Sequence, residues 1–203
     1  MNQKTVLVTF KTVIALLGFS AIVTELATLV ERQSLNIVNF FSYFTVENNI
    51  IFAFTILLSA FATASGKSSR FLDSLRGFST VFMVVVGIGF AILLSGIEGI
   101  PLTAVPWDNT VLHYIIPVAA VVDYLIDRPK HRLYFSRSFL WMIYPVAYII
   151  YALVRGQLTG WYPYPFLNPA NDGWMSVGIT IGGLFVLSVA LIWLVSLLSG
   201  SRR

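Results

Sequence analysis

The sequence predicts an all-α integral membrane protein, a bundle of six transmembrane helices with both termini in the cytoplasm. Three observations predict this fold: a very apolar composition, six long apolar segments, and basic residues concentrated in alternate connections. Of the 203 residues, 57% are hydrophobic and only 11% are charged, whereas soluble domains average about 25% charged residues. Too few charges remain to cover a water-facing surface, which excludes an ordinary soluble domain and disfavours a nucleic-acid partner.

Six segments are apolar enough to cross a bilayer core of about 30 Å, which takes roughly 20 residues of helix. The spans expected from hydropathy are residues 9–30, 40–63, 78–97, 109–126, 139–154 and 175–198. The connections between them are short, so we expect residues 1–203 to form one transmembrane domain with no soluble domain attached.

The first segment has a second interpretation, because a basic start followed by an apolar stretch up to Val23 also fits a signal peptide. Two observations favour a retained helix. Apolar residues resume after Glu25, and the segment has no clear small-residue cleavage site.

The basic residues predict the orientation. Eleven of the thirteen lie on the side of the N-terminus, and only Arg32 and Arg155 lie on the other side. By the positive-inside rule the first side is cytoplasmic, and a multipass protein of the cell membrane is expected. The eleven residues are Lys4, Lys11, Lys67, Arg70, Arg76, Arg128, Lys130, Arg132, Arg137, Arg202 and Arg203.

The connection before the last span contains the run WYPYPFLNP, residues 161–169. Its three prolines prevent a regular helix. The run therefore predicts either an ordered aromatic cap over the outer end of the bundle or a belt of rings at the lipid headgroups.

Ionisable residues are costly inside a membrane, which makes them functional candidates. Here they are Glu25, Glu47, His113 and Asp123. Thr45 lies five residues beyond Phe40 and His113 lies five residues beyond Asp108, where two parallel spans enter from the outer side. Both are therefore roughly 7–8 Å deep at 1.5 Å per residue. A hydroxyl and an imidazole at one depth could form a nucleophile and its general base.

Two asparagines share a helical face with Thr45. Asn48 and Asn49 follow it by three and four residues, so their amide groups could donate to a developing oxyanion. Glu47 lies about 200° round the same helix, so we expect it to face elsewhere and to orient a neighbouring polar group or to be protonated.

Two other acidic residues, Glu25 and Asp123, are expected at different distances from the candidate site. Glu25 lies near the outer end of the first span and could reach the site from a third helix. Asp123 lies near the inner interface, too far along its helix to orient the imidazole directly.

A structural interpretation stands beside the catalytic one. A lone threonine in a membrane helix usually bonds to its own helix or to a neighbour. Tyr144, Tyr148 and Tyr151 form a stripe at helical spacing, which predicts helix packing or, alternatively, the lining of a pocket.

Three segments resemble those of a known family. They are FSYFTVENN (41–49), LHYIIPVAAVVDYL (112–125) and YPVAYIIYALVRG (144–156), the last followed by the WYPYPFLNP run. On these segments the chain resembles small bacterial members of the androgen-induced-gene and androgen-dependent TFPI-regulating protein family of multipass membrane hydrolases.

The resemblance implies a six-span bundle with an intramembrane threonine nucleophile and a histidine partner. Thr45 and His113 fall on the matching positions. Animal members of the family cleave fatty acid esters of hydroxy fatty acids, but these substrates do not follow for the bacterial branch. Glu47 stands where the family pattern leads us to expect an uncharged amide, so the resemblance implies no role for it.

We therefore expect an integral membrane hydrolase that cleaves a lipid or fatty-acid ester, with membrane lipids and a lipid-like substrate as its partners. No cofactor or metal is expected, because His113 is the single histidine within a span and bis-histidine haem ligation needs two. Two alternatives stay open: an ion or small-molecule transporter that uses Glu47, Asp123 and Glu25, and a non-catalytic membrane assembly protein.

Overall fold

The computed structural model describes residues 2–97 and 103–200. In this part of the chain six helical segments are long and apolar enough to cross a membrane, and no strand occurs, which confirms the all-α six-helix bundle. The segments are α1 (Gln3–Glu31), α3 (Phe44–Ser65), α4 (Arg70–Leu93), Pro106–Ile126, Phe135–Thr159 and α9 (Pro169–Leu198).

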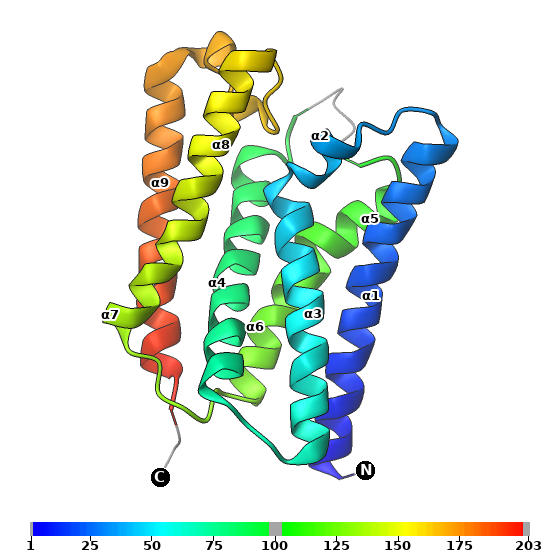
Figure 1. The fold of residues 1–203 in the computed structure, drawn as a ribbon, viewed down its shortest axis with the longest axis vertical. Coiled ribbons are helices and arrows are strands. Elements are labelled where there is room, and N and C mark those ends of the chain that lie inside the picture. The colour runs from blue at the N-terminus through cyan, green and yellow to red at the C-terminus, as the bar shows by residue number, and fades with distance from the viewer. Residues whose placement is uncertain (1, 98–102, 201–203) are drawn as a thin grey trace.

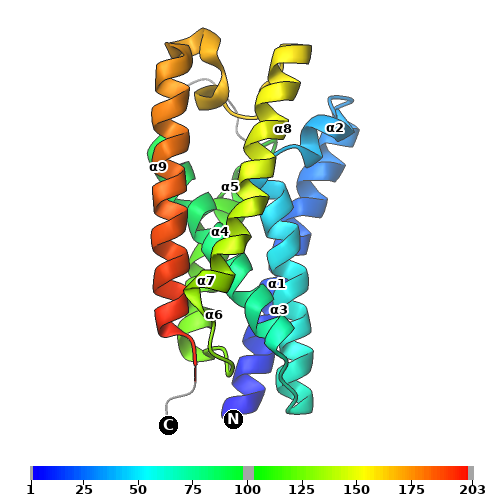
Figure 2. The same cartoon turned by 60° about the vertical axis from the view of Figure 1, so that its left-hand side comes forward.

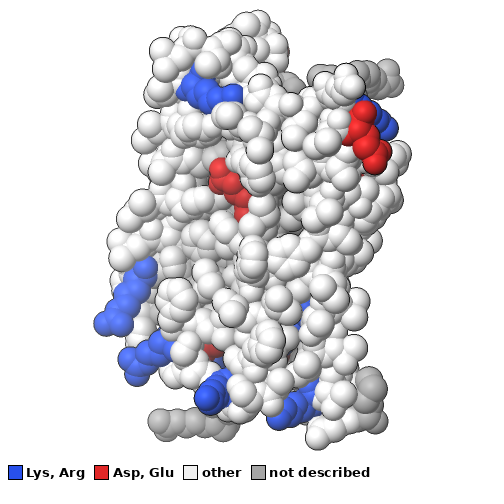
Figure 3. Space-filling view, turned by 45° about the vertical axis from the view of Figure 1, so that its right-hand side comes forward, with Lys and Arg blue, Asp and Glu red and all other residues white. Residues whose placement is uncertain are grey.

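The first helix begins and the last helix ends at the same end of the bundle (Figures 1 and 2). Figure 3 shows basic side chains gathered mostly toward that end, below a broad band with almost no charge. The location of this end of the bundle in the cytoplasm stays a prediction from the charges. One buried core lies among α1, α3 and α4 and the fourth span, and a second lies between α4 and α9.

The second span departs from the continuous helix predicted from residue 40. A short α2 (Ile37–Phe41) ends at Ser42, and α3 begins only at Phe44. Tyr148 stabilises this break, because its hydroxyl donates to the Ser42 carbonyl at 2.9 Å and accepts from the Phe44 N–H at 3.2 Å. The break places Thr45 in the first turn of α3 instead of five residues along a span.

The fourth span consists of α5 (Pro106–Thr110), the π-helical turn η1 (Val111–Ile115) and α6 (Ile116–Ile126). Pro117 has no N–H to donate to the His113 carbonyl four residues before it. The preceding N–H, of Ile116, donates five residues back to Val111. His113 is therefore carried on a local π-helical bulge, a feature frequent at functional sites.

The last two spans are joined by the aromatic loop. The fifth comprises α7 (Phe135–Ser138), η2 (Phe139–Met142) and α8 (Ile143–Thr159), and the loop contains η3 (Pro165–Leu167). Inside α9, Gly173 has a φ of 76°, a left-handed conformation that glycine adopts without strain. The continuous helix therefore starts at residue 174, next to the predicted start at 175.

A buried ionic cluster ties α1, α4 and α6 together toward the end of the bundle that holds both termini. Lys11 pairs with Asp123 and, at 3.0 Å, with Asp127, while Arg76 pairs with Asp123 at 2.8 Å. Lys11 is fully buried and Arg76 is 5% exposed. Both oxygens of Asp123 are engaged by cations, so the structure gives this residue a structural role.

Candidate active site

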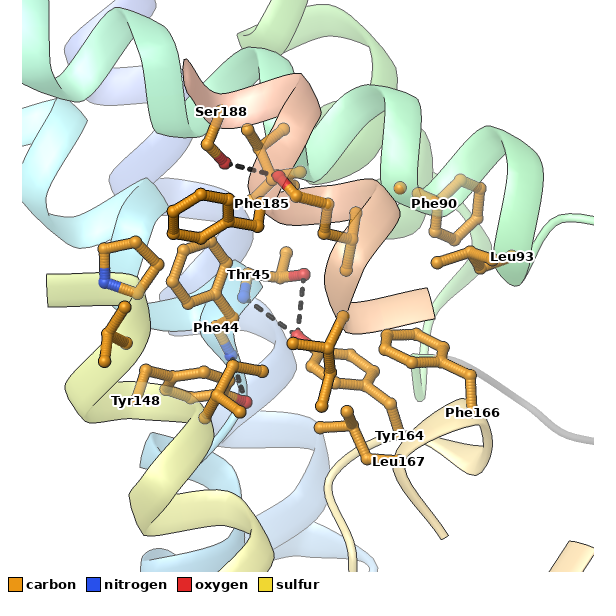
Figure 4. Close-up of a pocket in the computed structure, with 18 of the residues that line it drawn as sticks. Phe44, Thr45, Phe90, Leu93, Tyr148, Tyr164, Phe166, Leu167, Phe185 and Ser188 are labelled. Atoms are coloured by element: carbon orange, nitrogen blue, oxygen red, sulfur yellow. Dashed lines mark hydrogen bonds between the residues drawn. The ribbon is translucent and has the colours of Figure 1, made fainter. Parts of the chain in front are cut away.

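A cavity of about 210 Å³ lies between α3, α4, α8 and α9, under the loop of residues 160–168 (Figure 4). Most of its wall is apolar, with polar side chains from Thr45, Tyr148, Tyr164 and Ser188. Its apolar lining includes Val86 and Phe90 of α4, Val146 and Ile149 of α8, and Ile181 and Phe185 of α9.

The cavity opens on the outer surface of the bundle between α8 and α9. Val146 and Ile150 of α8 and Phe185 of α9 line it, yet their exposed fractions are 43%, 58% and 43%. These side chains belong to segments long and apolar enough to cross a membrane. The opening therefore faces the region that lipid chains would occupy.

Thr45 and Tyr164 meet at the wall of this cavity. The Thr45 N–H donates to the Tyr164 hydroxyl at 3.1 Å, and the Thr45 Oγ1 lies 3.3 Å from the same oxygen. Figure 4 shows both interactions. Because Tyr43, before α3, provides no side-chain cap, the hydroxyls of Tyr148 and Tyr164 satisfy the first N–H groups of the helix.

Tyr164 is held by a well-packed loop. The Tyr162 ring lies so close to Gly156 that a Cβ there would come within 2.1 Å of it. Leu167 is fully buried, and the Tyr164 ring stacks on Phe166 with centroids 5.1 Å apart. Burial raises the pKa of Tyr164 to about 12, so the phenol stays protonated near neutral pH.

The sequence predicted either a cap or a belt at the lipid headgroups for this loop, and it did not single out Tyr164 as a site residue. The phenol is 119 positions from Thr45, and no spacing rule links the two. A tyrosine among aromatic loop residues gave no distinguishing signal.

His113 is buried, with an exposed fraction of 6%. Its Nδ1 lies 3.1 Å from the Asn109 carbonyl. A carbonyl can only accept, so we assign the proton to Nδ1 and the free lone pair to Nε2, the form a general base requires.

Phe90 stacks on the imidazole with centroids 4.0 Å apart. Phe90 lines the cavity and His113 does not. Among the described residues no hydrogen bond joins Thr45 to His113.

Asn49 brings the two predicted catalytic segments together. Its amide donates to the Thr45 carbonyl at 2.9 Å and to the Leu112 carbonyl at 3.2 Å. One side chain thus joins the first turn of α3 to the residue before His113. The two segments are neighbours, although the hydroxyl and the imidazole are not in hydrogen-bond contact.

The other amide and Glu47 form a separate chain toward α8. Asn48 donates to the Phe44 carbonyl at 2.8 Å and to the Tyr144 hydroxyl at 3.0 Å, and that hydroxyl donates to Glu47 at 2.8 Å. Both amide protons of Asn48, like those of Asn49, have protein acceptors. The oxyanion role of the asparagines and the supporting role of Glu47 stay predictions.

Glu25 does not line the cavity. Its two oxygens accept from the Ala104 N–H at 2.9 and 2.8 Å, which ties the outer part of α1 to the segment before α5. Within residues 2–97 and 103–200 the structure shows no cluster of three or more His, Asp or Glu side chains that could hold a metal ion.

No family model, curated protein or solved structure matches this chain.

Proposed function

We propose that this protein is an integral hydrolase of the cell membrane that cleaves a lipid or fatty-acid ester, with Thr45 as nucleophile and His113 as general base. The observation that carries the proposal is the place of the Thr45 hydroxyl, on the wall of an apolar cavity in a membrane-like bundle. An ester with long apolar chains would bury those chains there and place its carbonyl beside a hydroxyl.

The opening between α8 and α9 supports a substrate that comes from the bilayer. Its rim carries exposed apolar side chains, including Ile150 and Phe185. A polar solute would lose its hydration in such a passage without compensating hydrogen bonds. A lipid chain in the bilayer has no hydration to lose, so an ester dissolved in the bilayer suits this access route.

In the proposed reaction, the Thr45 Oγ1 bonds to the ester carbonyl carbon and its proton moves to the His113 Nε2. The intermediate then expels the alcohol oxygen, which takes the proton from His113. A water molecule, deprotonated by His113, attacks the acyl-threonine, and the acid leaves as the Thr45 hydroxyl reforms.

The contact between nucleophile and base requires a rearrangement on substrate binding. The Thr45 O–H bond turns toward the imidazole while Oγ1 keeps its contact with the Tyr164 phenol, and the Phe90 ring, which stacks on His113 and lines the cavity, shifts so that the two groups meet. Catalytic hydrogen bonds are often long or poorly aligned before substrate binds. The bridge through Asn49 keeps both segments close during this change.

The resemblance to the androgen-induced-gene family is part of the same proposal, because it depends on the segments that carry Thr45 and His113. We extend the threonine–histidine chemistry of that family to this chain, but not the substrates of its animal members.

An active-site fluorophosphonate probe tests the proposal on the purified protein in detergent micelles. We expect labelling of the wild type and none of Thr45→Ala or His113→Ala. Thr63→Ala is the matched control, because Thr63 lies on the same helix and, among the described residues, its hydroxyl bonds only to the Ser59 carbonyl one turn earlier. Labelling that persists in both site variants would overturn the hydrolase mechanism.

A further inference from the structure

We infer that Tyr164 is a further catalytic residue, whose phenol O–H donates the hydrogen bond that stabilises the oxyanion formed when Thr45 attacks an ester. The inference rests on the proposed function and deepens it, since it names the group that receives the developing negative charge.

The hydrogen bonds of the phenol leave its proton available for this task. A tyrosine hydroxyl has one proton to donate and can accept from other donors. The Thr45 N–H already donates to the Tyr164 oxygen. Within the described residues, the single acceptor near the phenol proton is the Thr45 Oγ1, at 3.3 Å.

That acceptor weakens as the reaction proceeds. When the Thr45 Oγ1 bonds to the carbonyl carbon, it shares an electron pair and becomes an ester-like oxygen. The electrons of the carbonyl π bond move to the carbonyl oxygen, which is attached to the same carbon and becomes the strongest acceptor nearby. The phenol proton then turns from Oγ1 to this oxyanion.

The resulting bond is stronger in the transition state than in the resting state, which is the requirement for catalysis. The Thr45 proton goes to the His113 Nε2, and the alcohol takes it when the carbonyl reforms. Tyr164 keeps its own proton throughout and changes only the oxygen to which it donates.

Other polar groups near the cavity are already engaged. Asn48 and Asn49 each donate both amide protons to protein acceptors. The Tyr148 proton is used at the Ser42 carbonyl, and Ser188 donates to the Leu184 carbonyl at 2.7 Å. Tyr164 is thus the cavity side chain whose proton is free to form a hydrogen bond with the developing oxyanion.

The loop that carries Tyr164 holds the phenol in place before substrate arrives. Leu167 is fully buried, and Tyr162 fills the space over Gly156. A donor that is already oriented needs no reorganisation when charge develops. Burial also raises the pKa of Tyr164 to about 12, which keeps the donor protonated.

The competing explanation is that Tyr164 only caps α3. The test compares hydrolysis of p-nitrophenyl decanoate by the wild type, Tyr164→Phe and Tyr162→Phe in detergent micelles. Tyr162→Phe removes a hydroxyl from the same loop, and within the described part of the chain that hydroxyl bonds only to the exposed Gln157. We expect Tyr164→Phe to lower kcat about 10²–10³-fold with little change in KM, and Tyr162→Phe to match the wild type.

An inhibitor pair separates transition-state from ground-state binding. A decyl trifluoromethyl ketone forms a hemiketal oxyanion with the nucleophile, whereas the matching methyl ketone binds without reacting. Loss of an oxyanion donor weakens only the trifluoromethyl ketone in Tyr164→Phe. Equal weakening of both ketones, or a kcat within about threefold of the wild type, would overturn the inference.

Thr45→Ala distinguishes a failure of the proposed hydrolase function from a failure of the proposed role of Tyr164. If Thr45→Ala hydrolyses the ester like the wild type, the proposed function fails. If Thr45→Ala is inactive and Tyr164→Phe is fully active, only the role of Tyr164 fails.

Should Tyr164→Phe not fold, difluorotyrosine introduced at position 164 retains the hydroxyl and makes it more acidic. A change in kcat with phenol acidity supports the donor role, and an unchanged kcat contradicts it.

Discussion

The phenol oxygen of Tyr164 lies 3.1 Å from the backbone nitrogen of Thr45 and 3.3 Å from its side-chain oxygen. One loop residue therefore caps the first turn of α3 and contacts the proposed nucleophile. This contact connects the fold of the outer end of the bundle with the chemistry proposed for the cavity.

The anchoring of the loop at Gly156 makes a first prediction. In Gly156→Ala the new Cβ would lie 2.1 Å from the Tyr162 ring, so the loop and Tyr164 must shift. We expect a loss of about 1–3 kcal/mol in stability, as for other overpacked sites, together with lower ester hydrolysis. Thermal unfolding and the decanoate assay measure the two effects.

Gly178→Ala is the control for Gly156→Ala, because a Cβ at Gly178 meets no atom of residues 2–97 or 103–200 within 4 Å. Wild-type behaviour of Gly156→Ala in both assays would show that the loop does not depend on this contact.

The cavity itself can be filled from α4. Gly89 lines it, and a Cβ there would lie 3.8 Å from a methyl group of Leu184, which is ordinary contact. We expect Gly89→Phe to occupy the space of a substrate chain and raise KM for p-nitrophenyl decanoate about tenfold or more, since even one methylene in a pocket can be worth that factor.

Gly182→Phe on α9 introduces the same ring where a Cβ meets no described neighbour within 4 Å. It should leave KM unchanged. If Gly89→Phe also leaves KM unchanged, the ester does not bind in this cavity.

The break between α2 and α3 depends on one hydroxyl from α8. Tyr148→Phe leaves the Ser42 carbonyl and the Phe44 N–H without this partner. An unsatisfied buried group costs about 1–3 kcal/mol, so we expect a clearly lower Tm.

The comparison variant for the break is Tyr114→Phe, because Tyr114 is 44% exposed and its hydroxyl makes no hydrogen bond with the described residues. Equal Tm values for the two variants would show that other interactions hold the break.

The ionic cluster predicts that Asp123→Asn lowers the stability of the protein more than Asp127→Asn does. Asp123→Asn removes the charge shared by the buried Lys11 and Arg76, and breaking a buried pair costs about 3–5 kcal/mol. Asp127→Asn should cost less, because the Asp127 side chain is 22% exposed and solvent replaces part of its role. Thermal unfolding of both variants measures this order, and the reverse order would contradict the assignment of Asp123 as the centre of the cluster.

The candidate site was only partly predictable. The rarity of polar side chains in an apolar chain singled out Thr45 and His113, and the structure places their segments together through Asn49. The same reasoning could not find Tyr164, which belongs to a loop 119 positions away. It also could not foresee that Phe90 would stack on His113 and line the cavity, whereas His113 does not line it.

The sequence by itself determined the six helical spans, because hydropathy is a sum over neighbouring residues and a helix satisfies its own backbone in lipid. Hydropathy also placed the start of the last span at residue 175, close to where the structure begins the continuous helix after Gly173. Only the tertiary structure decided where the second span breaks, how Lys11 and Arg76 are neutralised, and which hydroxyl meets Thr45. In an apolar interior a polar group must find its partner on whichever helix packs against it, and a local pattern does not contain that information.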